Sequence, residues 1–418
     1  MPTTDTVVIG AGHAGLAVSH LLTEAGRDHV VLDRGQVAER WRSERWDSLH
    51  LLTPNWMTRL PGWDYRGRDS EGYMAARELV AHLERYAESF AAPVRSGTTV
   101  LSVTAAGGGY QVVTDQETWH ARHVVVATGP WGTPRIPEGI DAAGSGLNLT
   151  TASRYRNPDA LPDGGVLVVG ASSSGVQIAD ELARAGRRVV LAVGRHTRMP
   201  RRYRGMDIFW WLERTGRLGR TIDEVRDRAA ARNEPSMQLV GHNEPDRFVA
   251  DLDLPSLAGQ GVRVTGRLRA LDAGIASFQD NLVASVAESD RRMHRFLDAV
   301  DDHVRRSGLA SEVWAPVRPR PFLPDDVPAR LDLRAEGIST VLLATGYRPH
   351  HPWLDVPVKA ADGSIRQHRG ITPASGLYVV GQRFQHRRDS GFIDGARHDA
   401  EAVVAHLSAN RPLDPSLR

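Results

Sequence analysis

The sequence contains no cysteine, and this absence excludes several kinds of chemistry at once. Disulfide scaffolds, iron–sulfur clusters, thiolate zinc sites, cysteine nucleophiles and redox-active dithiols all need a thiol. Lysine is almost absent too, since Lys359 is the only lysine among 52 basic side chains. The other basic side chains are arginines, whose planar guanidinium pairs with carboxylate or phosphate through two parallel hydrogen bonds.

An excess of charge and long apolar runs are also missing. The 52 basic and 50 acidic side chains leave a formal net charge of +2, so we expect no broad surface for nucleic acid. No apolar run approaches the roughly 20 residues that span a bilayer. The first expected strand begins at Thr6, which leaves no room for a leader. We therefore expect a cytoplasmic protein with no membrane segment.

Strand-like apolar runs alternate with helical patterns, which is typical of a parallel sheet with helices on both faces. One strand–helix–strand unit occupies residues 6–33, and a second unit with the same order occupies residues 166–193. The 418 residues allow two or three domains. Two such units predict an α/β protein with two Rossmann-like dinucleotide-binding domains.

We expect the first domain to be discontinuous. Residues 1–158 would form its first part, residues 159–328 the second domain with a helical insertion, and residues 329–418 the returning part of the first domain. The elements expected in this last segment are two strands, at 341–344 and 377–380, and a helix at 394–407.

The segment from Gly205 to Val317 allows several interpretations. Apolar residues between Leu282 and Val304 recur at helical spacing, which predicts a packed helix or a subunit contact. The run Phe209–Leu212 fits a substrate mouth or a dimer face equally well. We leave open whether this segment forms a lid, a substrate wall or a dimer surface, and a homodimer is left open with it.

The residues that follow the first strand form a G-x-G-x-x-G loop that opens a helix. Gly10 would make the turn, Gly12 would admit a pyrophosphate to the backbone, and Gly15 would let helix and strand pack closely. Asp33 ends the next strand and is placed to accept hydrogen bonds from ribose hydroxyls. The loop therefore predicts a dinucleotide site.

A looser copy of this loop follows the first strand of the second unit. A serine replaces the second glycine, and an arginine rather than an acid follows the second strand, where it would pair with the 2′-phosphate of NADP. The alternative is a solvated basic loop. The residues expected at this second site are Gly170, Ser172, Ser173, Ser174, Gly175 and Arg195.

Two further patterns lie beside these loops. The triplets Ala127-Thr128-Gly129 and Ala344-Thr345-Gly346 each close an apolar strand, where small residues let the backbone pass beside a nucleotide. Separately, the segment from Arg40 to Leu60 alternates tryptophans with polar side chains. Its aromatic rings would bury a flat cofactor ring, although a tryptophan-rich surface loop is the alternative. Its polar candidates are His50, Thr53 and Asn55.

These motifs together resemble class B flavoprotein monooxygenases, among them the bacterial flavin-containing-monooxygenase-like proteins and the plant YUCCA type. The resemblance rests on the two glycine loops, on W-R-x-x-R-W-D-S-L-H-L-L-T-P from Trp41 and on L-A-T-G-Y from Leu343. It implies FAD on the first unit and NADPH on the second. It also implies that a C4a-(hydro)peroxyflavin transfers one atom of O2 to a small organic substrate.

The same resemblance assigns residues to each cofactor, and it names no catalytic side chain beyond the polar candidates above. Separately from the resemblance, the helix that begins near Phe392 would stabilise negative charge on the flavin if its N-terminus points there, and an ordinary amphipathic closing helix is the alternative. The residues expected at FAD are Gly10, Gly12, Gly15, Asp33, Arg34, Trp41, Val100, Thr128, Gly129, Gly381 and Gln382, and those expected at NADPH are the second-site residues together with Thr345 and Gly346.

The sequence also allows a second function. An FAD-dependent NAD(P)H reductase that passes electrons to a ferredoxin-like partner would use the same fold, with the arginines from Arg195 to Arg204 as a basic docking surface. A nucleotide sensor without enzymatic activity needs fewer cofactor sites than the chain offers. No metal site is expected, because His350 and His351 are adjacent and no ligand spacing such as H-E-x-x-H occurs.

Overall fold

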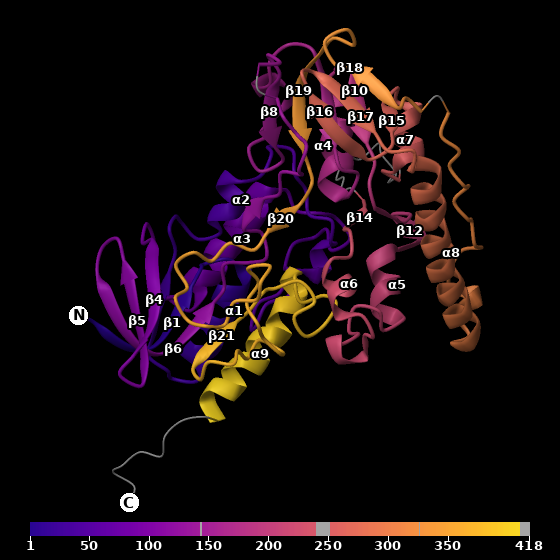
Figure 1. Ribbon diagram of the computed structural model, residues 1–418. Helices are drawn as coiled ribbons and strands as arrows, with labels where there is room; N and C mark the ends of the chain where they lie inside the picture. The colour runs from indigo at the N-terminus through magenta and orange to yellow at the C-terminus, as the bar shows by residue number, and fades with distance from the viewer. Residues whose placement is uncertain (143, 240–250, 326, 410–418) are drawn as a thin grey trace, which may run out of the picture.

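The computed structural model describes residues 1–142, 144–239, 251–325 and 327–409. These residues form two units, each built around its own sheet (Figure 1). The N-terminal strands and the C-terminal helix share the lower unit, and the middle of the chain forms the upper one. The expected α/β class with two Rossmann-like units is confirmed.

The first sheet combines a parallel part with an antiparallel ribbon. Its strands are β1 (Thr3–Ile9), β2 (His29–Leu32), β3 (Val94–Arg95), β4 (Val100–Ala106), β5 (Gly109–Thr114), β6 (Thr118–Val126) and β21 (Leu377–Val379). Their order is β3-β2-β1-β6-β5-β4, and β21 pairs in parallel with the second half of β6. The chain therefore returns to this sheet near its end, as the sequence predicted for 377–380.

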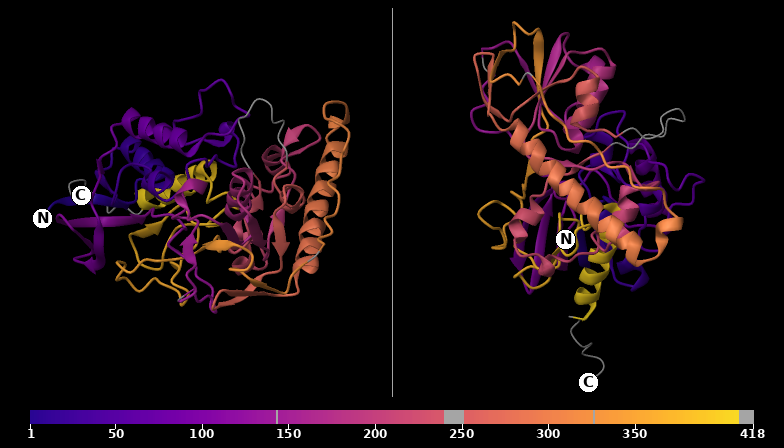
Figure 2. Two further views of the ribbon diagram at one scale, coloured as in Figure 1. Left: turned by 90° about the horizontal axis from the view of Figure 1, so that it is seen from above. Right: turned by 90° about the vertical axis from the view of Figure 1, so that its right-hand side faces the viewer.

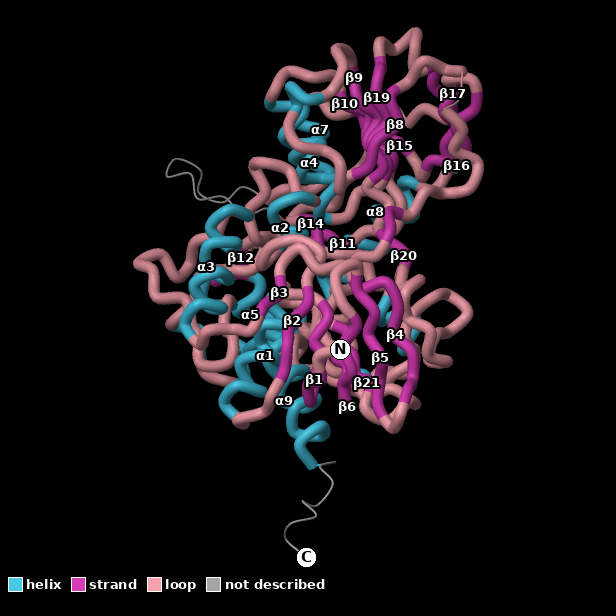
Figure 3. Tube along the Cα trace, turned by 90° about the vertical axis from the view of Figure 1, so that its left-hand side faces the viewer, coloured by secondary structure: helices cyan, strands magenta, loops and turns pink. Residues whose placement is uncertain are grey.

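Helices cover one face of the first sheet, as Figure 3 shows. They are α1 (His13–Glu24), α3 (Ala76–Ser89) and α9 (Ile393–Ala409). Their apolar sides bury Val8, Val31 and Val125 from the strands. The opposite face buries Val7, Val30 and neighbouring apolar residues. Burial on both faces explains why β1 and β2 are continuous apolar runs rather than alternating ones.

The second sheet is entirely parallel. Its strands are β8 (Asn148–Thr151), β9 (Gly165–Val169), β10 (Val189–Ala192), β15 (Arg263–Thr265) and β19 (Ile338–Leu343), in the order β15-β10-β9-β19-β8. Helices α4 (Ser173–Arg184) and α7 (Leu254–Gly259) pack on one face. An antiparallel sheet of β16 (Leu268–Asp272), β17 (Ile275–Phe278) and β18 (Arg330–Asp332) covers the other face.

One expectation about the last segment is wrong. The strand expected at 341–344 is β19, which pairs with β9 through Val341 and Leu167 and belongs to the second sheet rather than the first. Its neighbour β8 lies before residue 158 and also joins the second sheet. A central strand of a parallel sheet is apolar on both sides in either unit, so the pattern itself could not assign it.

The remaining helices and strands connect the two units or fill the insertion. They are α2 (Glu39–Ser43), β7 (Thr133–Pro134), β11 (Thr197–Arg198), β12 (Arg202–Tyr203), β13 (Met206–Asp207), α5 (Ile208–Arg214), α6 (Arg228–Arg232), β14 (Met237–Gln238), α8 (Leu282–Arg306) and β20 (Tyr347–Arg348). β7 and β20 pair in antiparallel fashion, so the two chain crossings between the units lie side by side.

The insertion joins the units through a shared apolar cluster. Phe209 and Trp211 of α5 are buried with apolar residues of α8, and the cluster also contains Met57 and, at its edge, Phe392 of the first unit. The right-hand view of Figure 2 shows α8 as a long helix that runs from the upper unit toward the lower one. For Phe209 and Trp211, both surface interpretations are therefore wrong, because these side chains pack inside the molecule. Residues 240–250 of the insertion lie outside the described residues.

The described residues contain neither a helix suited to a membrane nor a cluster suited to a metal ion. Among the described helices, none combines the length and the apolar character that a bilayer crossing requires. Across the same part of the chain, no three histidine, aspartate or glutamate side chains are grouped so as to hold a metal ion.

Candidate cofactor sites

The first glycine loop lies at the carboxyl ends of β1 and β6. Gly10 has φ +110°, and a Cβ there would lie 2.7 Å from the carbonyl oxygen of Ala127. A Cβ on Gly15 would overlap the carbonyl oxygen of Gly10. Gly12 differs from both, because it is extended (φ −79°) and its missing Cβ points into space, with no atom of the described residues within 4 Å. Gly10 and Gly15 shape the loop, whereas Gly12 leaves room above it.

The helix start beside Gly12 carries an unpartnered polar atom. Nε2 of His13 is buried and has no hydrogen-bond partner among the described residues. Burial lowers the pKa of His13 to about 4, so the ring is neutral near pH 7. Free amide groups at the start of α1 and the open space above Gly12 fit a phosphate group. These residues therefore fit the pyrophosphate of a dinucleotide.

Asp33, just after the end of β2, is hydrogen-bonded to the first glycine loop. Its carboxylate accepts the N–H of Ala11 at 2.7 Å and the N–H of Gly35 at 2.9 Å. Burial raises the pKa of Asp33, and the two backbone hydrogen bonds act in the opposite direction. The carboxylate is in place beside the glycine loop, and its contact with a ribose stays a prediction.

Four other residues expected at FAD lie around the same strand ends. Arg34 is exposed and pairs with Glu44, and Trp41 of α2 has the guanidinium of Arg45 5.3 Å from its ring centroid. The chain just before Val100 is bonded to the Asp33 turn, since Thr98 donates to the Asp33 carbonyl at 2.8 Å. Thr128 directly follows the end of β6 that overlies Gly10.

Gly381 and Gln382 close the first site from the other side. Gly381 follows β21 with φ +73°, and a Cβ there would lie 2.9 Å from the Cβ of Ala14 in α1. The amide of Gln382 donates through Nε2 to the carbonyl of Gly129 at 3.3 Å. The structure thus brings the two ends of the first unit together at the glycine loop.

The second glycine loop repeats the geometry of the first. Gly170 has φ +111°, and a Cβ there would lie 2.5 Å from the carbonyl oxygen of Ala344. A Cβ on Gly175 would overlap the carbonyl oxygen of Gly170. Each loop therefore lies beneath an Ala-Thr-Gly triplet at the end of a neighbouring strand, which explains why the triplet occurs twice.

The polar residues at the second loop differ in whether their side chains already have hydrogen-bond partners. Ser172 is the N-cap residue of α4, Ser173 and Ser174 lie in its first turn, and none of the three hydroxyls caps the helix. Thr345 donates its hydroxyl to the carbonyl of Arg135, and Gly346 accepts the N–H of the same residue at 2.8 Å. The serine hydroxyls stay available for a phosphate, while Thr345 holds the crossing between the units.

The arginines after β10 do not form a docking surface. Arg195 is exposed, but Arg198 is buried and bonded to Asp253 and Asp290, both at 2.8 Å. Arg201 is buried too and pairs with Asp207. Arg198 and Arg201 therefore cannot belong to the basic dock expected at Arg195–Arg204, because carboxylates of the insertion neutralise both side chains inside the protein.

The tryptophan-rich segment lies between the two units. Leu51 donates its N–H to Met74 at 2.8 Å, and the Leu52 carbonyl accepts Nη1 of Arg201 at 2.8 Å. His50 is half-buried and bonded to the Ser48 carbonyl, and Thr53 is half-buried. Asn55 is buried, with Nδ2 bonded to the Asp69 carbonyl and Oδ1 without a partner among the described residues.

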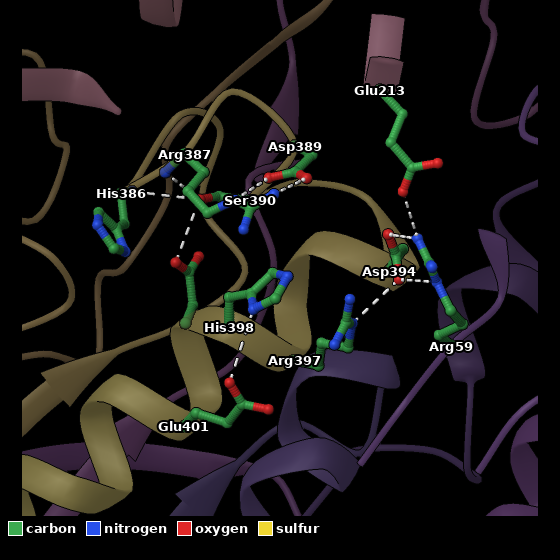
Figure 4. A network of polar contacts seen from close by, with 11 residues as sticks. Arg59, Glu213, His386, Arg387, Asp389, Ser390, Asp394, Arg397, His398 and Glu401 are labelled. Atoms are coloured by element: carbon green, nitrogen blue, oxygen red, sulfur yellow. Dashed lines mark hydrogen bonds and ion pairs between the residues drawn. The ribbon is translucent and has the colours of Figure 1, made fainter. Parts of the chain in front are cut away.

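The start of α9 meets this segment through an ion pair that the sequence did not reveal. Arg59 donates to both oxygens of Asp394, each at 2.7 Å, and also to Glu213 of α5 at 3.0 Å (Figure 4). Arg397 approaches the same Asp394 at 3.1 Å. Three distant segments therefore converge at the helix end that was expected to face the flavin. Only the carboxylate in the first turn of α9 was a signal for this contact in the sequence.

A second buried carboxyl of α9 gives a testable pH dependence. Burial raises the pKa of Asp399 to about 7, and nearby Asp389 acts in the same direction. Ser390 donates to one carboxyl oxygen at 3.2 Å. Because the unfolded pKa is about 3.9, Asp399 stabilises the fold fully below pH 4, and this contribution is lost as the pH rises through 7.

We therefore expect Asp399→Asn to change the pH dependence of stability. From pH 5 to pH 8, the free energy of unfolding of the wild type should fall by about 2–3 kcal/mol relative to the variant. Urea unfolding at both pH values measures this difference. The contribution of the histidines to the pH dependence cancels in the comparison, because they titrate in both proteins. Asp302→Asn, at an exposed position of α8, is the control, and its free energy of unfolding should change with pH as that of the wild type does. If the free energies of unfolding of D399N and D302N changed equally between pH 5 and pH 8, Asp399 would be ionised over that whole range.

Comparisons with known proteins agree with this geometry. A family model described as pyridine nucleotide-disulphide oxidoreductase matches residues 7–205. The chain is 30% identical to an uncharacterized oxidoreductase CzcO-like protein of Geobacillus kaustophilus, over 96% of this chain and 97% of that protein. It is 27% identical to the indole-3-pyruvate monooxygenase YUCCA4 of Oryza sativa subsp. japonica, over 96% of this chain and 87% of that protein.

A solved structure shows the same fold. The flavin-containing monooxygenase of Stenotrophomonas maltophilia aligns with a TM-score of 0.65 and 19% identity, over 98% of this chain and 99% of that one. The full-length match to the CzcO-like protein and the two glycine loops agree with the resemblance found in the sequence. The chain belongs to the family of the CzcO-like oxidoreductases and is a flavin-dependent oxidoreductase, and it is similar to the class B flavoprotein monooxygenases.

Proposed function

We propose that this protein is an NADPH-dependent FAD monooxygenase that transfers one atom of O2 to a small organic substrate. The first unit binds FAD through the Gly10–Gly15 loop, and the second binds NADPH through the Gly170–Gly175 loop. The observation that carries this proposal is the repeated geometry, in which each loop lies beneath an Ala-Thr-Gly strand end. The likeness over 96% of the chain to the YUCCA relative, which is named a monooxygenase, supports the reaction class.

The chain's own residues would position the cofactors and exclude water. Bound FAD and NADPH would supply the hydride transfer and the activation of O2, so that no side chain need act as nucleophile. The apolar cluster of Phe209, Trp211, Met57 and Phe392 closes the junction where the tryptophan-rich segment meets α9. Such a closed junction would keep water from the activated oxygen.

An electron-transferring reductase is the competing function, and the structure offers it less support. Its docking surface was expected among arginines that are buried in ion pairs. The tryptophan-rich segment is likewise held between the units rather than exposed to a partner.

A stopped-flow experiment distinguishes the two functions. The protein is reduced with NADPH without oxygen and then mixed with O2. We expect a transient absorbance that belongs to neither reduced nor oxidised flavin, because the closed junction slows the loss of activated oxygen. Direct return to oxidised flavin, together with rapid reduction of an added ferredoxin, would instead favour the reductase.

A further inference from the structure

The second sheet brings together two arginines that are far apart in the sequence. β10 and β15 are parallel neighbours, with Val190 opposite Arg263 and Ala192 opposite Thr265. Val193 extends this ladder by donating to the Thr265 carbonyl at 3.1 Å. The residues that follow the two strands are Gly194-Arg195 and Gly266-Arg267. Because the strands are parallel, both arginines lie beyond the same end of the sheet.

Direct contacts fix Arg267 beside the Arg195 turn. The Cγ atom of Arg267 lies 4.0 Å from the position of a Cβ on Gly194, so the arginine stem lies along the backbone just before Arg195. The backbone of Arg267 is held on the other side, where its N–H donates to Asn281 Oδ1 and its carbonyl accepts the N–H of Gln279, both at 2.9 Å. The backbone is thus fixed while the guanidinium extends to solvent.

Both guanidinium groups are uncommitted. Arg195 and Arg267 are exposed, and no hydrogen bond or ion pair of either guanidinium occurs within the described residues. Neighbouring arginines are different, since Arg198 is buried between two aspartates and Arg292 donates to the His196 carbonyl while approaching Glu288. Two guanidinium groups at the same end of neighbouring strands, next to the second glycine loop, suit an anion with more than one charge.

We propose that Arg195 and Arg267 together bind the 2′-phosphate of NADP(H), which makes Arg267 a specificity-determining residue. This inference rests on the proposed function, because it presumes a dinucleotide on the second unit. The 2′-phosphate of a dinucleotide lies beyond the end of the second strand of the unit, which here is β10. Two guanidinium groups can surround a phosphate with charge-assisted hydrogen bonds, whereas NADH offers them only a neutral hydroxyl.

Binding of two adenosine phosphates to the full-length, FAD-loaded protein tests this assignment. Isothermal titration calorimetry would compare adenosine 2′,5′-bisphosphate with 5′-AMP in the wild type, Arg267→Ala and Arg195→Ala. Each variant should bind the bisphosphate about 10- to 100-fold more weakly, because a charged hydrogen bond is lost. Binding of 5′-AMP should not change, since it lacks the 2′-phosphate.

Arg188→Ala is the matched control. Arg188 precedes β10 at its opposite end and forms a surface contact with Glu336, so R188A removes the same charge far from the proposed subsite. R188A should retain the wild-type affinity for both probes. Equal bisphosphate affinities of R267A and R188A would overturn the role of Arg267.

Two further outcomes separate this inference from the proposed function. If the wild type binds both probes equally and is reduced as fast by NADH as by NADPH, the 2′-phosphate subsite is refuted while the monooxygenase proposal stands. If the wild type binds neither probe and neither nicotinamide cofactor reduces its flavin, the proposed function itself fails, and this inference fails with it.

Discussion

Replacing Gly12 with valine is expected to leave the protein folded and to abolish its flavin content. Gly12 is extended, a conformation that valine adopts without strain. Its side-chain direction points into space with no atom within 4 Å. The new methyl groups would occupy the room that a pyrophosphate needs above the start of α1. Affinity for FAD should fall by about 100-fold or more, because several charged hydrogen bonds are lost together.

The visible absorbance that bound flavin gives the purified protein and titration of FAD into apoprotein measure this effect. Gly15→Val provides the contrast, since its Cβ would overlap the carbonyl oxygen of Gly10, and that variant should lose stability as well as flavin. Gly259→Val is the matched control, because Gly259 is exposed on α7 with open space around it. Normal FAD binding by G12V would refute the first cofactor site.

The sequence was sufficient to predict both glycine loops, because their function depends on local geometry. Gly10 and Gly170 follow a strand and open a helix, and the same turn needs the same residue in each place. The Ala-Thr-Gly triplets were recognised as a pair, but their positions above these glycines depend on strand order. Strand order is decided by contacts between distant segments, which a local pattern does not contain.

The same limit explains the errors. β19 is apolar on both sides, so its sequence fits the centre of either parallel sheet, and only its pairing with β9 assigns it. Arg198 and Arg201 resembled a solvated basic run because the partners that bury them, Asp253, Asp290 and Asp207, come from later parts of the chain. Arg267 escaped notice for a related reason, since only the neighbouring position of β10 and β15 brings it to Arg195.

The buried ion pair of Arg201 should produce a large loss of stability when it is broken. Arg201 is fully buried, and its Nε donates to Asp207 at 2.9 Å. Its guanidinium lies 4.5 Å from the ring centroid of Tyr73, whose hydroxyl donates to the same carboxylate at 2.7 Å. Arg201→Met would keep the apolar stem but leave Asp207 as a buried charge without its cation. We expect the free energy of unfolding to fall by about 3–5 kcal/mol.

Urea unfolding followed by tryptophan fluorescence measures this loss, because Trp211 lies in the buried apolar cluster of the insertion. The double variant Arg201→Met/Asp207→Asn should recover part of the stability, since no uncompensated carboxylate remains. Arg188→Ala at the surface should cost less than about 1 kcal/mol. Arg201 also holds the Leu52 carbonyl, so R201M should release the tryptophan-rich segment from the insertion and shorten the lifetime of the oxygen-dependent absorbance. If R201M were as stable as R188A, the Arg201–Asp207 pair would not stabilise the insertion.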